Sequence, residues 1–141
     1  MKNLILLFGF QFLFLCNFAQ VPVINQSFNE ASVKSTKKTM TVSTGAAERT
    51  WKWTGKGLVT TEFVNLETGK KWTNVEPAFS SDWAFYDIID ETPAKLINLE
   101  VRQSDDEGFT TPHLEIVAEI EYPSVASFVK YQIWAYPNAP G

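Results

Sequence analysis

"HLEIVAEIEYPSVASFVKYQIWAY", residues 113–136, contains two runs in which every second side chain is apolar. Within residues 113–122, the alternate positions from Leu114 to Tyr122 are apolar and three glutamates stand between them. A period of two predicts a strand with one buried and one solvated face. Pro123 and Ser124 predict a turn, after which residues 127–136 alternate again. The stretch therefore predicts two antiparallel strands that pack one face on a core.

A second group of strands is expected upstream, where two turns rich in glycine interrupt β-type sequence. Trp51 and Trp53 share one face of an alternating run whose other face is wholly polar. We therefore interpret these two tryptophans as core residues rather than as a sugar-binding surface. Glycines in both turns supply the positive φ that tight reversals need. The expected meander has strands at 48–54, at 58–65 and around 71–72, joined by turns at 55–57 and 67–70.

The remaining segments add further strands and no helix. Residues 40–43 and the aromatic run 83–89 are short strand candidates, and residues 95–102 alternate with Ile97, Leu99 and Val101 on one side. Residues 20–38 lack a clear period and are expected to form an extended lead-in with one loosely held strand. Because no segment has a helical period, the predicted fold is all-β, an antiparallel β-sandwich or part of one spanning 39–141.

The first 19 residues are typical of a signal peptide. Lys2 precedes an apolar run from Leu4 to Leu15, and Ala19 is a small residue at the expected cleavage point. The run is shorter than the roughly 20 residues that a membrane span requires, so no membrane span is expected. Cys16, the only cysteine, also allows a lipoprotein interpretation. The sequence predicts a secreted or periplasmic protein whose mature part has no thiol.

The composition argues against several classes of function. The formal net charge of −4, with lysines in the first half and carboxylates in the second, is unlike that of a nucleic-acid-binding domain. Glu119 and Glu121 lie on one open strand face, which cannot give a glycosidase pair its two different environments. His113, the only histidine, has no cysteine or histidine partner for a metal. No catalytic residue, metal site or cofactor is predicted.

Two tryptophans remain as candidates for contact with carbohydrate. Aromatic rings stack on the C–H faces of pyranoses, while neighbouring polar groups bind the hydroxyls. Trp83 ends a loop that contains Pro77, and Trp134 shares a strand face with Lys130 and Gln132. Both are expected on an exposed surface that contacts a sugar or another domain.

Three stretches, "TVSTGAAERTWKWTGKGLVTTEFVNLETGKKW" (41–72), "SSDWAFYDI" (80–88) and "LEIVAEIEYPSVASFVKYQIWAYPNAPG" (114–141), carry a family resemblance. Together they resemble the N-terminal β-sandwich of secreted bacterial α-galactosidase-like glycoside hydrolases of the family 36 type. The resemblance implies a β-supersandwich that packs on a catalytic barrel, whose two aspartates perform retaining hydrolysis of α-galactosides. It implies loops that rim a sugar pocket in the same or a neighbouring subunit, so a homo-oligomer is one expectation. None of the catalytic residues maps onto this sequence.

These observations leave three hypotheses open. The leading one is a non-catalytic N-terminal domain that lacks its partner barrel, because the sequence stops at Gly141 directly behind a predicted strand. The second is a free-standing secreted carbohydrate-binding module, and the third is an adhesive or structural β-domain. In the first two, Trp83 and Trp134 are the expected contacts with an α-galactoside-type glycan.

Overall fold

The computed structural model describes residues 20–75, 78–83 and 92–140. The predicted signal peptide and most of the predicted strand 83–89 lie outside these residues. The strands are β1 (Asn25–Phe28), β2 (Ala31–Ser35), β3 (Thr39–Ser43), β4 (Ala47–Trp53), β5 (Leu58–Asn65), β6 (Lys71–Thr73), β7 (Lys95–Ser104), β8 (His113–Tyr122) and β9 (Ser127–Ala135). Two short 3-10 turns, η1 (Asp106–Gly108) and η2 (Pro123–Val125), flank β8.

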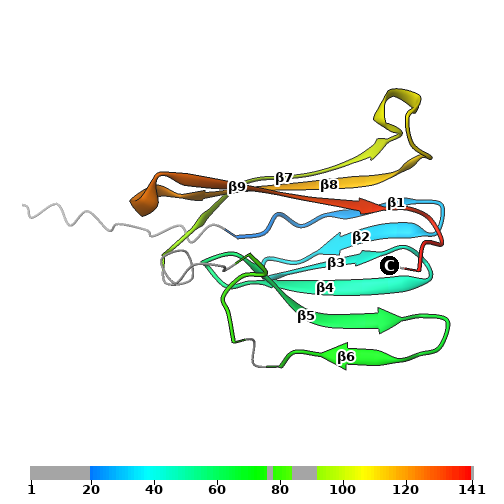
Figure 1. Ribbon diagram of the computed structural model, residues 1–141, viewed down its shortest axis with the longest axis horizontal. Coiled ribbons are helices and arrows are strands. Elements are labelled where there is room, and N and C mark those ends of the chain that lie inside the picture. Colours follow the sequence, from blue (N-terminus) through cyan, green and yellow to red (C-terminus); the bar gives the residue numbers. More distant parts are fainter. Residues whose placement is uncertain (1–19, 76–77, 84–91, 141) are drawn as a thin grey trace, which may run out of the picture.

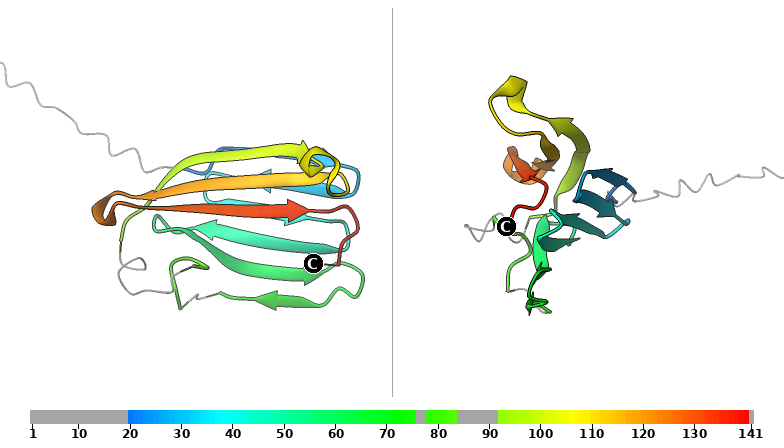
Figure 2. Two further views of the ribbon diagram at one scale, coloured as in Figure 1. Left: turned by 45° about the horizontal axis from the view of Figure 1, so that its top comes forward. Right: turned by 90° about the vertical axis from the view of Figure 1, so that its right-hand side faces the viewer.

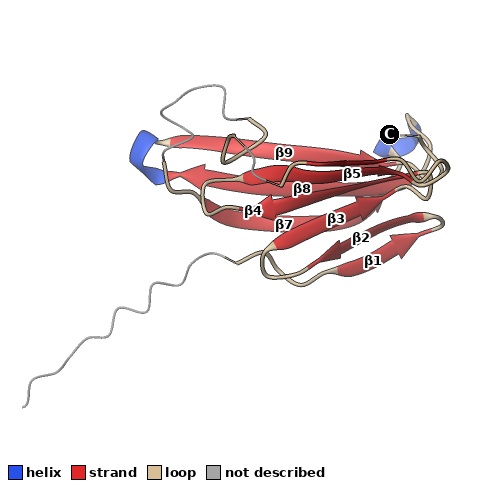
Figure 3. Ribbon diagram, turned by 90° about the horizontal axis from the view of Figure 1, so that it is seen from below, coloured by secondary structure: helices blue, strands red, loops and turns tan. Residues whose placement is uncertain are grey.

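The strands form two antiparallel sheets that lie face to face (Figure 1, Figure 3). The larger sheet is a six-stranded meander in the order β1-β2-β3-β4-β5-β6, and the smaller sheet has the order β7-β8-β9. This arrangement confirms the predicted all-β, antiparallel, sandwich-like fold. Within the described ranges, no helical segment is long and hydrophobic enough to span a bilayer.

Within the predicted lead-in 20–38, residues 25–35 form a hairpin of the larger sheet. Asn25 to Phe28 pairs with Ala31 to Lys34 as a hairpin, and β2 pairs in turn with β3. Val21, Ala31 and Val33 are at most 2% exposed and join the core. The expected single, loosely held strand is thus two ordered strands. In so short a stretch, the alternation of apolar and polar residues is too weak to predict two strands. Their formation depends on packing against the smaller sheet.

The core lies between the sheets, with β8 as its central strand in the smaller sheet. The inward side chains of β8, from Leu114 to Tyr122, are at most 1% exposed. They face Met40, Trp51 and other apolar side chains of the larger sheet in one continuous cluster. The predicted inward positions of β8 and the core position of Trp51 and Trp53 are confirmed.

A bulge corrects the predicted inward face of β7. Leu96 pairs with Ile120 and Asn98 with Glu119, so Ile97 is an extra residue between two pairs. An extra residue reverses the alternation at that point. Ile97 is consequently 53% exposed, and Leu96 packs on the core in the place expected for Ile97.

The smaller sheet covers only part of the larger one, and β5 and β6 project beyond β9 (Figure 2). On the inner face of the larger sheet, Phe63 pairs across strands with Arg49 and with Trp72. The rings of Phe63 and Trp72 lie 5.6 Å apart, and Trp72 is 48% exposed. We call these two residues the aromatic shelf. It continues the core face, and no strand of the described residues lies above it.

Candidate functional site

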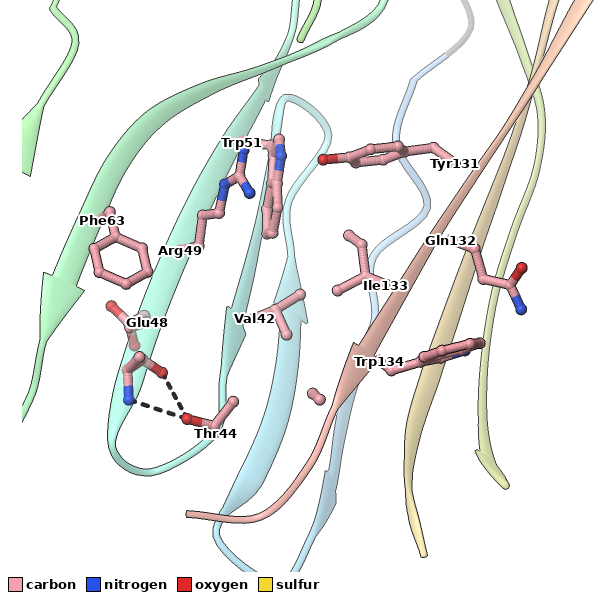
Figure 4. Close-up of a pocket in the computed structure, with 12 residues that line it drawn as sticks. Val42, Thr44, Glu48, Arg49, Trp51, Phe63, Tyr131, Gln132, Ile133 and Trp134 are labelled. Carbon is pink, nitrogen blue, oxygen red and sulfur yellow. Dashed lines mark hydrogen bonds between the residues drawn. The ribbon is translucent and has the colours of Figure 1, made fainter. Parts of the chain in front are cut away.

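A groove of about 260 Å³ opens where β9 ends the smaller sheet and the larger sheet continues (Figure 4). Its floor comes from β3, β4 and β5, and its wall comes from β9. The C-terminal segment crosses between the sheets at Thr44, whose carbonyl accepts a hydrogen bond of 2.6 Å from the Asn138 amide. The lining residues are Val42, Thr44, Ala47, Glu48, Arg49, Trp51, Phe63, Tyr131, Gln132, Ile133, Trp134 and Ala135.

The pleat of β9 sends its side chains to two different surfaces. Tyr131 and Ile133 point toward the larger sheet, whereas Gln132 and Trp134 point away from it (Figure 4). The Tyr131 ring packs edge-on against Trp51 at 6.3 Å and lies 5.0 Å from the Trp83 ring. Burial raises the pKa of the Tyr131 phenol, which therefore stays protonated at neutral pH. The groove wall thus offers a neutral hydroxyl beside aromatic carbon.

Asp82 ties the segment before β7 to the floor of this groove. Its carboxylate accepts hydrogen bonds from the Trp51 indole at 3.0 Å, the Thr60 amide at 2.8 Å and the Thr60 hydroxyl at 2.6 Å. Arg49 forms an ion pair with it at 3.0 Å, and the guanidinium lies 4.7 Å from the Trp51 ring centre. Because four donors already occupy the carboxylate, Asp82 is a structural anchor.

Gly57 allows the same segment to approach β5. A Cβ at this position would lie 2.5 Å from the Ser81 Cβ and 2.9 Å from the Trp83 ring, which is closer than real Cβ atoms come. The Asp82 amide donates to the Leu58 carbonyl at 2.9 Å. The predicted turn at 55–57 therefore has a second function, because its glycine admits a neighbouring segment.

Trp83 lies in the core, although the sequence led us to expect it on the surface. It is 8% exposed, and its indole donates to the Tyr122 hydroxyl at 2.7 Å. That hydroxyl donates to the Lys56 carbonyl at 2.6 Å. A loop residue can be buried in this way when the segment folds back over the sandwich edge. Little of the Trp83 ring is open to a ligand.

Trp134 lies where the sequence placed it, on the outer face of the smaller sheet, and is 50% exposed. Its ring contacts His113 edge-on at 5.9 Å, and His113 also packs on Tyr136 at 4.5 Å. The structure therefore separates the two predicted sugar contacts, with Trp83 inside the sandwich and Trp134 outside it. The predicted role of Trp134 in binding a sugar stays a prediction.

A buried carboxylate supports the surface beside Trp134. Glu115 is only 3% exposed although it faces outward, because Arg102 on β7 and Gln132 on β9 fold over it. Arg102 donates to it at 2.6 and 2.7 Å, and the Gln132 amide donates to its other oxygen. Burial alone would raise the pKa of Glu115, but hydrogen bonds from Arg102, Gln132 and Trp134 and the charge of Arg102 lower it overall. Glu115 is therefore ionised at neutral pH.

His113 begins β8 and is fully buried. Its Nδ1 donates to the Thr111 carbonyl at 2.9 Å. Nε2 has no hydrogen-bond partner. Because the ring packs between Trp134 and Tyr136, we interpret His113 as an aromatic support for Trp134.

The described residues include histidine, aspartate and glutamate side chains, which are the usual metal ligands and catalytic groups. Among them, no group of three histidine, cysteine, aspartate or glutamate side chains is placed to hold a metal ion. Two of the buried or half-buried carboxylates in these regions, Glu115 and Asp82, accept hydrogen bonds from residues of neighbouring strands. From the sequence we did not expect Tyr131 and Phe63 to line a groove. Both are visible there as aromatic residues at alternate strand positions. Their partly open environment, however, depends on where β9 ends.

Comparison of the chain with protein-family models, with curated proteins and with solved structures found no match.

Proposed function

We propose that this chain is the non-catalytic N-terminal β-sandwich of an exported α-galactosidase-like glycoside hydrolase. In this role it supports a catalytic barrel and contributes a rim to the sugar site. The sandwich is the part of a β-supersandwich that contains the meander and the β8–β9 pair. The catalytic aspartates belong to the barrel.

The aromatic shelf is the observation that carries the proposal. Phe63 and Trp72 continue the core face of the larger sheet beyond the smaller sheet. Lys70 lies 4.9 Å from the Trp72 ring, so the rim of the shelf is cationic. An apolar sheet face that adjoins a core and ends in polar side chains is typical of a surface that packs on another module.

Trp134 supports the carbohydrate part of the proposal. Half of its surface is open, its orientation is held by His113, and the Arg102 and Gln132 side chains lie on the same sheet face. An exposed indole beside amide and guanidinium donors suits a pyranose ring with its hydroxyls.

The coding sequence downstream of codon 141 tests the proposal first. We expect it to continue in frame into a barrel that carries two aspartates. The longer protein should hydrolyse an aryl α-galactoside, while the 141-residue chain should not. Trp72→Lys should lower the activity of the longer protein by disturbing the shelf, and Phe109→Lys, at a loop residue that is 89% exposed, serves as the matched control. A stop codon, or a longer protein inactive on α-galactosides, would overturn the proposal.

A free-standing carbohydrate-binding module is the second candidate, because Trp134 and the groove are open in the chain as it stands. Its test is migration in a native gel that contains galactomannan. Retarded migration that Trp134→Ala abolishes and Phe109→Ala preserves would favour the module. Migration of the wild type at the same rate with and without the polysaccharide would remove this candidate.

A further inference from the structure

Two adjoining hollows lie near the end of β4 that is remote from the Thr44 turn. One, of about 300 Å³, is lined by Lys52, Thr54, Val59, Thr61, Val75, Ala78, Phe79 and Ser80. The other, of about 550 Å³, is lined by Gln20, Lys37, Lys38, Lys52, Trp53, Thr54 and Gly55. Lys52 and Thr54 belong to both hollows. We call the combined surface the basic cleft.

The fold explains why the basic cleft faces away from the groove. Lys52 stands between Trp51 and Trp53, which are buried, so the pleat of β4 sends Lys52 to the opposite face. The Trp53 amide donates to the Lys38 carbonyl at 2.8 Å, which holds the turn with Lys37 and Lys38 beside the end of β4. Three lysines from two segments are thereby placed around one hollow.

Among the described residues, these three lysines have no acidic partner. In the described part of the chain, the ion pairs are Arg49–Asp82, Lys71–Glu62 and Arg102–Glu115, and none involves Lys37, Lys38 or Lys52. The chain as a whole carries a net charge of −4, so acidic side chains are available elsewhere. Like charges gathered in one concave surface repel each other and raise the local concentration of anions. The cleft is therefore suited to a ligand with negative charges.

The neutral lining narrows the class of that ligand. Phe79 is 60% exposed and Val75 is 85% exposed, so the smaller hollow presents an open aromatic ring and apolar carbon. The Thr54 hydroxyl donates to the Ser80 carbonyl at 2.7 Å, which fixes the segment bearing Phe79 next to Lys52. A ring for stacking beside ammonium groups fits a sugar that carries an anionic group better than it fits an isolated phosphate.

We propose that the basic cleft binds a polysaccharide that bears carboxylate or sulfate groups. The cations of Lys37, Lys38 and Lys52 contact the anionic groups, and Phe79 stacks on a sugar ring. This site is separate from Trp134 and the aromatic shelf, so it does not depend on the function proposed above.

Affinity electrophoresis of the full chain tests the proposal with polygalacturonate, dextran sulfate, neutral dextran and duplex DNA as probes. We expect retardation by at least one of the two anionic polysaccharides and none by neutral dextran. The triple variant K37Q/K38Q/K52Q should bind the retarding polysaccharide at least about tenfold more weakly, because three contacts with a polyanion are lost. The control K34Q/K95Q/K130Q removes three lysines outside the cleft and should bind like the wild type.

Phe79→Ala separates recognition of a sugar from simple attraction between charges. It should weaken polysaccharide binding several-fold without changing the net charge, while the control Phe109→Ala has no effect. Preference for polygalacturonate identifies the carboxylate, and preference for dextran sulfate identifies the sulfate. Absence of retardation by both polysaccharides would overturn the proposal. Equal losses in the two triple variants, or DNA binding as tight as polysaccharide binding, would also overturn it.

Discussion

Trp51 and Trp72 occupy the same face of the same sheet, yet their surroundings differ. Trp51 on β4 is 2% exposed beneath the smaller sheet, whereas Trp72 on β6 is 48% exposed on the aromatic shelf. Each has a cationic neighbour above its ring, Arg49 at 4.7 Å and Lys70 at 4.9 Å. The difference arises because β9 is the last strand of the smaller sheet and lies short of β5 and β6. One half of the face is therefore core, and the other half is available for contact.

Trp51→Ala should have the largest effect on stability. The substitution removes a buried aromatic ring and the indole donor to Asp82, so the free energy of unfolding should fall by about 3–5 kcal/mol. Trp72→Ala is the matched control in the uncovered half and should cost less than about 1.5 kcal/mol, mainly its contact with Phe63. Urea denaturation of both variants gives the comparison. Equal losses would mean that the smaller sheet does not determine the burial of this face.

Glu115→Gln should lower the stability by an intermediate amount, because Glu115 is buried by neighbouring side chains and not by a second sheet. The variant loses charge-assisted hydrogen bonds from Arg102 and Gln132, and should be destabilised at pH 7 by about 1.5–3 kcal/mol. A substitution on the outer face of the smaller sheet would then lower the stability much as one in the covered half of the larger sheet does. This would hold although only neighbouring side chains cover that outer face.

The same variant gives a pH dependence of defined sign. The pKa of Glu115 is lowered below its ordinary value of 4.5, so the carboxylate stabilises the fold above that pH and loses this contribution as the pH falls through its folded pKa. The difference in unfolding free energy between wild type and Glu115→Gln should therefore be largest near neutral pH and shrink below pH 4.5. Denaturation curves at several pH values measure it. A difference that grew on acidification would contradict the assigned hydrogen bonds.

A double-mutant cycle on the aromatic shelf should show the smallest effect. Phe63→Ala and Trp72→Ala together are expected to reveal a coupling energy of about 0.5–1.5 kcal/mol in the chain as it stands. When another module packs on the shelf, both residues are buried and each single substitution should cost more. Unchanged costs in a longer protein would argue that the shelf is not a contact surface.

Much of the fold followed from alternation in the sequence. The ranges 58–65 and 113–122 match β5 and β8 to the residue, because both strands have long, regular patterns between clear turns. Ile97 was placed on the wrong side, since an alternating sequence carries no sign of the bulge that reverses it. The hairpin of β1 and β2 was also missed, because its strands are short and their burial depends on a sheet formed by residues some 80 positions away.

The candidate surfaces were harder to predict than the strands. Trp134 could be placed on an outer face from its neighbours Lys130 and Gln132 in the alternation. Trp83 could not, because a loop residue has no periodicity to show which way it points. The lysines of the basic cleft come from the turn before β3 and from β4, and nothing in their spacing shows that they share one hollow.

The sequence by itself determined which side chains lie on the same face of each strand and where most chain reversals occur, because pleating and turn chemistry are local. Tertiary structure alone decided which parts of those faces are covered. A nine-residue strand, Ser127–Ala135, ends the smaller sheet over the middle of the larger one. Whether a side chain is buried depends on which residues lie across the interface from it, and those residues are distant along the chain. For this reason Trp51 became core, Trp72 became shelf, and Trp83 was drawn inside.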